Sequence, residues 1–109
     1  MCCTLSRVTR SGQALVLTQG YRHVAARLTR YGALEIPMRA TCASVAPGEA
    51  LRLSIAAACF PAYPVNPGTG RDPAEASVDE AQIITIGVRH GGGFPSCVTL
   101  PVVMREGGA

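Results

Sequence analysis

Only two side chains in this sequence, His23 and His90, are histidines that could serve as a general base near neutral pH. His23 lies in the segment Tyr21 to Tyr31, and His90 stands beside a triple glycine. The chain has no Gly-x-Ser-x-Gly motif, the strand-to-helix turn that exposes a nucleophilic serine. We therefore predict no catalytic residue and a structural role for both histidines.

Two segments contain residue types that can bind a metal ion or a phosphate group. The carboxylates of the segment 60–80 lack the regular spacing of a calcium loop and predict a solvated face; they are Asp72, Glu75, Asp79 and Glu80. Gly91 to Gly93 is followed by Pro95 rather than by a helix start, so it predicts a flexible turn and not a phosphate cradle. We predict neither a metal nor a cofactor.

The cysteines are odd in number and form no Cys-x-x-Cys pair, which argues against a zinc site and against a disulfide framework. Cys42, Cys59 and Cys97 lie in apolar, strand-like segments, where a free cysteine usually behaves as a small buried hydrophobe. This usage favours a reducing compartment. With no secretory signal in the sequence, we expect a cytoplasmic location.

Arg52 is the charged side chain with the clearest structural setting. It alternates with Leu51, Leu53 and Ile55, and therefore points away from the face that these three aliphatic side chains share. A guanidinium there can pair with a carboxylate, either Glu49 or one from a neighbouring domain.

Composition limits the remaining possibilities. The 109 residues are 48% hydrophobic and 16% charged, which predicts a soluble, folded single domain, or a piece of one, with one core. No apolar run approaches the roughly 20 residues of a membrane span. The net charge of +3 comes from arginines scattered along the chain, so we predict neither a nucleic-acid nor a membrane partner.

The sequence on either side of Arg52 predicts short strands. Pro47-Gly48 predicts a turn, and a strand follows it to near Phe60, where a proline-rich stretch begins. Residues 3–8 and 14–17 predict a hairpin. Further strands are expected over 34–45, where Pro37 indicates an edge position or a bulge, over 82–88 and over 97–104.

Three segments carry no strand prediction. Residues 60–80 are expected to be a long proline-rich loop, and 105–109 a loose tail. Tyr21 to Tyr31 could be a short helix, because apolar residues recur three or four apart, or an irregular strand. About six short strands indicate an all-β fold, a β-sandwich or jelly roll. We expect it to be incomplete at the N-terminal end, with exposed edges that another domain or a second copy covers.

The order of several pieces over nearly the whole chain, from Cys3 to Val103, resembles the C-terminal domain of X-Pro dipeptidyl-peptidases and the related cocaine-esterase-like serine hydrolases. The pieces are Gly12 to Arg22, Pro47-Gly48 with Leu51 to Ile55, Phe60-Pro61 with Tyr63 and Asn66, Thr69-Gly70, and Ser96 with Leu100-Pro101-Val102.

This resemblance implies a jelly roll similar to galactose-binding domains, of which the chain would be the later part. It also implies a noncatalytic role: the family's Ser-His-Asp triad lies on a separate α/β-hydrolase domain, against which the jelly roll packs to help form the substrate cleft. We expect Arg52, Glu49, Asn66 and Tyr63 to make structural or interdomain polar contacts. The expected partner is that catalytic domain or, in a homo-oligomer, a second copy.

Two other functions stay open. The chain could be an independent carbohydrate or small-ligand binding module, although it has three tyrosines, two phenylalanines and no tryptophan to supply aromatic platforms. It could also be a self-associating structural fragment.

Overall fold

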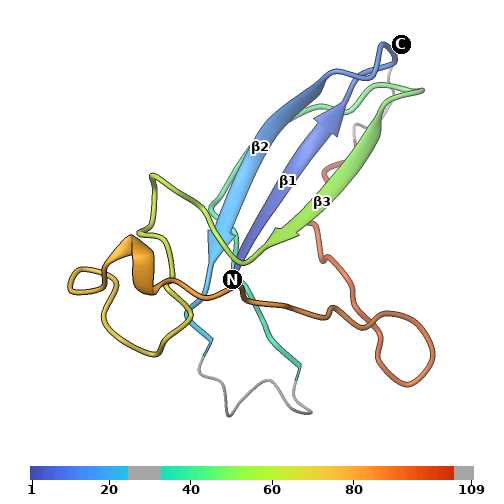
Figure 1. The fold of residues 1–109 in the computed structure, drawn as a ribbon. Helices are drawn as coiled ribbons and strands as arrows, with labels where there is room; N and C mark the ends of the chain where they lie inside the picture. Colours follow the sequence, from blue (N-terminus) through green and yellow to red (C-terminus); the bar gives the residue numbers. More distant parts are fainter. Residues whose placement is uncertain (25–32, 105–109) are drawn as a thin grey trace.

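The computed structural model describes residues 1–24 and 33–104 of the chain (Figure 1). These residues form three strands and one short helical turn: β1 (Cys2–Val8), β2 (Ala14–Tyr21), β3 (Ala50–Ala56) and the 3-10 turn η1 (Val78–Glu80). The all-β prediction is confirmed at this level. The segment 105–109 and most of Tyr21 to Tyr31 lie outside the described residues.

The strands form one antiparallel sheet in the order β2-β1-β3, with β1 in the middle (Figure 1). The predicted hairpin is confirmed, and its second strand is longer than expected. A tight turn joins β1 to β2, in which the amide of Gly12 donates to the carbonyl of Thr9 at 2.9 Å. Gly12 has a φ of 87°, a left-handed conformation that glycine adopts without strain.

A bulge interrupts the pairing of β1 with β2. Leu5 lies opposite Thr18, but Ser6 lies opposite Val16, so Leu17 has no partner on β1. An extra residue of this kind bends the strand and increases its twist. The pairing of β1 with β3 is regular and sets Leu5 opposite Leu53.

The core is small and follows β1. Cys2, Cys3 and Leu5 are at most 7% exposed, and because neighbouring side chains on a strand alternate, β1 is buried on both faces. Every residue of β3 is exposed. Its aliphatic side chains share a face with Leu5, yet Leu51, Leu53 and Ile55 remain 44%, 39% and 37% exposed.

Three predicted strands are absent from the described sheet. Within 34–45, the structure has a single bridge between Met38 and Gly20, at the edge where Pro37 was expected. The segments 82–88 and 97–104 form no ladder with any described residue. Their aliphatic alternation is present, but a strand requires main-chain partners, and the side chains of Ile84 and Ile86 stay 41% and 39% exposed.

The segment 60–80 folds on itself beside one end of the sheet (Figure 1). Arg71 pairs with Glu80 at 2.9 Å, and Ser77 and Glu80 form a capping box around η1. The amide of Gln82 donates to the carbonyl of Pro67 at 2.8 Å, which brings the end of this segment back to its middle.

The molecule is extended. Its radius of gyration is 17.3 Å, whereas a compact chain of this length has one of about 13 Å. Its accessible surface is 9176 Å², against about 5,700 Å² for a compact protein of this mass. Large apolar side chains contribute to this surface, for example Ile83 and Val103, which are 99% and 92% exposed. Among the described residues, no helix has the length and apolar character needed to cross a membrane.

The contact between Gly20 and the segment 37–39 can be tested by substitution. A Cβ atom at Gly20 would lie 2.5 Å from the carbonyl oxygen of Pro37, so Gly20→Ala must displace backbone. We expect a loss of about 1–3 kcal/mol in the free energy of unfolding, the usual cost of overpacking, measured by urea denaturation. Gly87→Ala is the matched control, because its Cβ would meet nothing within 4 Å. Equal midpoints for the two variants would contradict this contact.

Candidate functional site

The histidines and carboxylates that were considered as catalytic or metal-binding groups form no common site in the described part of the chain. His23 and His90 are both exposed, and neither makes a hydrogen bond or ion pair with another described residue. The carboxylates of 60–80 serve local structure: Asp72 accepts from the amide of Ala74 at 2.9 Å, and Glu80 pairs with Arg71. No group of three metal-ligating side chains was found within residues 1–24 and 33–104.

The triple glycine closes a turn, as predicted. Gly91 and Gly92 have φ values of 74° and 56°, and the amide of Phe94 donates to the carbonyl of Gly91 at 3.1 Å. The guanidinium of Arg89 lies 4.8 Å from the centre of the Phe94 ring, a cation-π contact across the turn.

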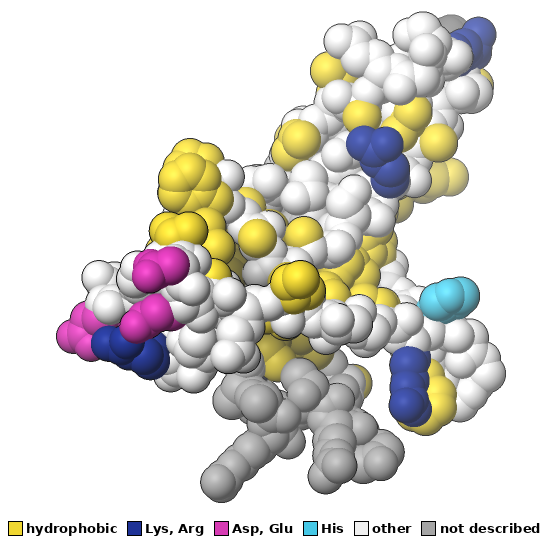
Figure 2. Space-filling view, viewed as in Figure 1, with side chains coloured by type: hydrophobic (Ala, Val, Ile, Leu, Met, Phe, Trp, Pro, Cys, Tyr) yellow, Lys and Arg dark blue, Asp and Glu magenta, His cyan; other side chains and the backbone are white. Residues whose placement is uncertain are grey.

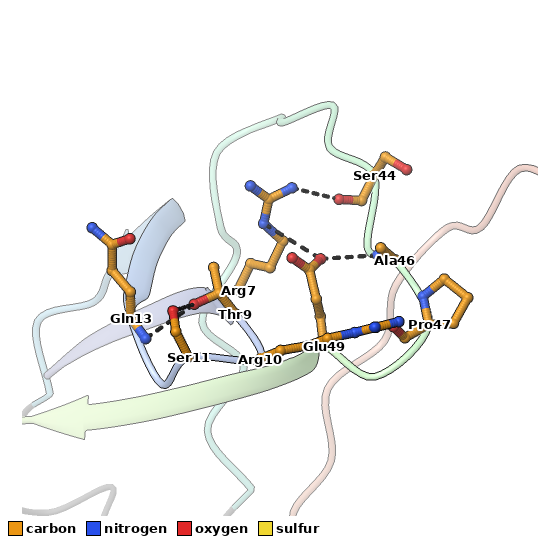
Figure 3. A network of polar contacts seen from close by, with 9 residues as sticks. All are labelled: Arg7, Thr9, Arg10, Ser11, Gln13, Ser44, Ala46, Pro47 and Glu49. Atoms are coloured by element: carbon orange, nitrogen blue, oxygen red, sulfur yellow. Dashed lines mark hydrogen bonds and ion pairs between the residues drawn. The ribbon is translucent and has the colours of Figure 1, made fainter.

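A polar cluster holds one end of the sheet (Figure 3). We call it the Arg7 cluster, and it consists of Arg7, Ser44, Ala46 and Glu49. The Arg7 guanidinium donates to the carbonyl of Ser44 at 2.7 Å, and its Nε lies 3.7 Å from Oε2 of Glu49. The same carboxylate oxygen accepts from the amide of Ala46 at 2.9 Å. Glu49 therefore ties the turn before β3 to the end of β1.

The predicted Pro47-Gly48 turn lies beside this cluster. The amide of Glu49 donates to the carbonyl of Ala46 at 3.0 Å, and Gly48 has a φ of 85°, as the third residue of a type II turn requires. Arg10 donates to the carbonyl of Pro47 through Nε at 2.9 Å and through Nη2. Two arginines, one from β1 and one from the β1–β2 turn, thus hold this turn.

Arg52 and Glu49 do not pair. Arg7 lies opposite Leu51 in the ladder, so Arg7 and Glu49 share the face of Leu51, whereas Arg52 lies opposite Ser6 on the other face. The three-residue spacing of Glu49 and Arg52 was the signal in the sequence that they would be on different faces. Arg52 has no carboxylate within ion-pair distance among the described residues.

The other two predicted polar residues make local contacts. Tyr63 stacks on Tyr21, with ring centres 3.8 Å apart and planes 13° apart. This contact joins the segment after β3 to the end of β2. The side-chain oxygen of Asn66 accepts from the amide of Gly68 at 2.9 Å, and this hydrogen bond closes an Asx turn inside the segment 60–80.

A cavity of about 200 Å³ lies at this second end of the sheet, opposite the Arg7 cluster. Its lining comes from the start of β1, the end of β2, the segment 37–39 and the segment after β3; it includes Cys2, Gln19, Tyr21, Arg39, Cys59 and Tyr63. The main chain of Arg39 fixes one wall, because its amide donates to the carbonyl of Gln19 at 3.1 Å and its carbonyl accepts from the hydroxyl of Thr18 at 2.5 Å.

The burial predicted for three cysteines is wrong for two of them. Cys42 and Cys97 are exposed and Cys59 is half-buried. The segments around Cys42 and Cys97 do not join the described sheet, so no face of that sheet buries their thiols. The buried thiols are those of Cys2 and Cys3. Burial raises the pKa of both thiols, and the neighbouring Cys59 thiol raises the pKa of Cys2 further.

Apolar side chains gather on the outside of the molecule. Figure 2 shows such a patch over the segment 60–80, and Phe60 and Val78 there are 72% and 91% exposed. These two residues also line a shallow groove with Pro64, Val65 and Ala81. Together with the exposed aliphatic face of β3, this is more apolar surface than single scattered residues would give.

Comparison with known proteins gives one family. The model of the X-Pro dipeptidyl-peptidase C-terminal non-catalytic domain matches residues 2–99, which include all three strands and both ends of the sheet. No curated protein and no solved structure matches the chain.

Substitution of Gly48 tests whether the hydrogen bonds of Arg10 to Pro47 stabilise the turn before β3. Gly48 and Gly70 both have φ near +80°, so alanine at either position costs about 1 kcal/mol of stability from backbone strain. A Cβ at Gly48 would also lie 2.7 Å from Nε of Arg10, while one at Gly70 meets nothing within 4 Å. We therefore expect Gly48→Ala to cost about 1 kcal/mol more than Gly70→Ala, through loss of the hydrogen bonds of Arg10 to Pro47.

Thermal or urea denaturation measures this difference, and the background variant Arg10→Ala provides its control. In that background the two glycine substitutions should become equally destabilising. A difference that persists without the Arg10 side chain would assign the effect to something other than these hydrogen bonds.

Proposed function

This chain belongs to the family of X-Pro dipeptidyl-peptidase C-terminal non-catalytic domains, and on that premise we propose that it supports an α/β-hydrolase catalytic domain and frames its substrate cleft. In this proposal the chain is part of a jelly roll of the galactose-binding type, acts in the cytoplasm and performs no chemistry itself. The hydrolase domain supplies the serine nucleophile and its base.

The partly exposed aliphatic face of β3 is the observation that carries this proposal. Leu51, Leu53 and Ile55 lie on one face of an edge strand, and each is more than a third exposed. The accessible surface exceeds that of a compact protein by more than the roughly 1,200–2,000 Å² that a standard protein interface buries. A protein layer of matching apolar character would complete the core that β1 begins.

Arg52 is the polar residue best placed for an interdomain contact. It is exposed on β3, and no described carboxylate neutralises it. Glu49, Asn66 and Tyr63 already have partners within the chain, so we assign them a structural role. A carboxylate of the catalytic domain would pair with Arg52 at the rim of the interface.

A second copy of the chain is the alternative partner that a specific observation favours. If β3 pairs with itself in antiparallel fashion about Leu53, then Leu51 lies opposite Ile55 of the copy, and Arg52 opposite Ser54. Aliphatic side chains then meet aliphatic ones, and no like charges face each other. The carbohydrate-binding alternative gains less support, because the stacking of Tyr21 on Tyr63 already covers one face of each ring.

Reconstitution tests the proposed function. We expect the chain alone to give no turnover of X-Pro p-nitroanilides. We also expect it to bind the α/β-hydrolase region of an X-Pro dipeptidyl-peptidase lacking its C-terminal domain, and to raise the melting temperature of that region, because the aliphatic face becomes covered. Leu53→Arg should weaken this binding at least tenfold by placing an unpaired charge in the interface.

Val102→Arg is the matched control, since Val102 is 74% exposed and lies outside the sheet. Turnover by the chain alone that a serine-blocking reagent abolishes would contradict the noncatalytic role. Equal binding by both arginine variants would contradict the assignment of this face, and binding to a sugar array in place of the hydrolase would favour the carbohydrate alternative.

Sedimentation velocity tests the second copy separately. Without a hydrolase domain, we expect the chain to sediment as a dimer that dissociates on dilution. Leu53→Arg should shift it to a monomer, because two guanidinium groups would face each other across the two-fold axis. Val102→Arg should remain a dimer. A wild-type chain that sediments as a monomer at every concentration would rule out the homo-oligomer and leave the hydrolase proposal in place.

A further inference from the structure

Two cysteines that the proposed function does not use face the same cavity. Cys2 begins β1 and is 3% exposed, whereas Cys59 follows β3 and is half-buried. Both line the cavity at the end of the sheet. We propose that Cys2 and Cys59 are a redox-active pair that forms an intramolecular disulfide and so fastens the segment after β3 onto the start of β1.

The sheet register brings the two positions together although they are far apart in the sequence. Cys2 lies opposite Ala56 in the β1–β3 ladder, and Cys59 follows Ala56 by three residues. Cys2 also lies opposite Tyr21, so these two side chains share a face of the sheet. The cavity is on this face, because Tyr21 and Cys2 both line it.

Contacts on the far side of Cys59 hold the returning segment in place. The amide of Tyr63 donates to the carbonyl of Cys59 at 2.9 Å, and the ring of Tyr63 stacks on that of Tyr21. The ladder thus fixes the backbone before Cys59, and the stack fixes the backbone after it. Cys59 is also close enough to Cys2 to raise the pKa of the Cys2 thiol, which agrees with this placement.

The other cysteines are worse partners for Cys2. Cys3 is adjacent in the strand, so its side chain points to the opposite face, on which Leu5 and Ile55 lie. Cys42 and Cys97 are exposed, and neither lines the cavity. The pairing is therefore specific, and Cys3 gives a control that differs from Cys2 in its face and not in its burial.

A glutathione-type disulfide can oxidise the pair in two exchange steps. The more accessible Cys59 thiolate attacks the oxidant, forms a mixed disulfide and releases the first glutathione thiolate. The Cys2 thiolate then attacks the sulfur of Cys59, which closes the protein disulfide and releases the second glutathione thiolate. The two cysteine thiols lose two electrons and two protons, and one glutathione disulfide becomes two glutathiones.

The experiment is equilibration of the purified chain with oxidised and reduced glutathione, followed by alkylation of free thiols under denaturing conditions and tryptic mass spectrometry. Cleavage at arginine places Cys2 and Cys3 in the peptide 1–7 and Cys59 in the peptide 53–71. We expect a crosslink between these two peptides, and a higher urea midpoint for the oxidised chain, because the crosslink restricts the unfolded chain.

Single variants identify the bonded thiols. Cys2→Ser and Cys59→Ser should abolish the crosslink, whereas Cys3→Ser, Cys42→Ser and Cys97→Ser should retain it; circular dichroism of each variant verifies that it folds. A crosslink that survives Cys2→Ser would overturn the assignment. So would a stable glutathione adduct on Cys59, or a crosslink that forms equally well in urea, where the sheet no longer holds the two positions together.

Discussion

The pairing of β1 on both of its edges is the constraint on which the rest of this structure depends. β1 is the one strand of the described sheet that pairs with two other strands, and its side chains supply the core residues Cys2, Cys3 and Leu5. Main-chain groups buried without partners are costly, so a strand this deeply covered must have a ladder on each side. β2 meets this need through a short turn. β3, which begins 42 residues after β1 ends, can meet it only if the intervening chain is returned to the right place.

Side chains at the two ends of the sheet hold β3 in that place. At one end, Arg7 and Arg10 hold the turn that precedes β3 (Figure 3). At the other end, the Tyr21–Tyr63 stack holds the segment that follows it. Neither the arginine contacts nor the tyrosine stack covers the outer edge of β3 or its aliphatic face. The strand is thus ordered along its length while its outer surface stays free, which is the arrangement that suits a noncatalytic domain proposed to present a surface to a partner.

The sequence predicted the local parts of this fold better than the long-range parts. Pro47-Gly48, the hairpin and the strand at Leu51 follow from residue types a few positions apart, and all three are present. The segments 82–88 and 97–104 show the same alternation, yet they form no ladder with a described residue, because alternation describes which faces a strand would have and says nothing of a main-chain partner. The same limit explains the site. The parity of Glu49 and Arg52 could have excluded their pairing, but the choice of Arg7 as the partner required the register of β1 against β3.

The cysteines illustrate what a register adds to a sequence. Spacing along the chain gave no reason to connect Cys2 with Cys59, since short-range cysteine patterns detect only ligands and crosslinks that are close in sequence. In an antiparallel ladder, residues near the start of one strand lie opposite residues near the end of the other. The largest sequence separations therefore occur at one end of the strand pair. Cys2 opens β1 and Cys59 lies just past the end of β3, which is where such a meeting is expected. The antiparallel pairing of β1 with β3 therefore creates, at one end of the sheet, the place where two distant thiols share a cavity.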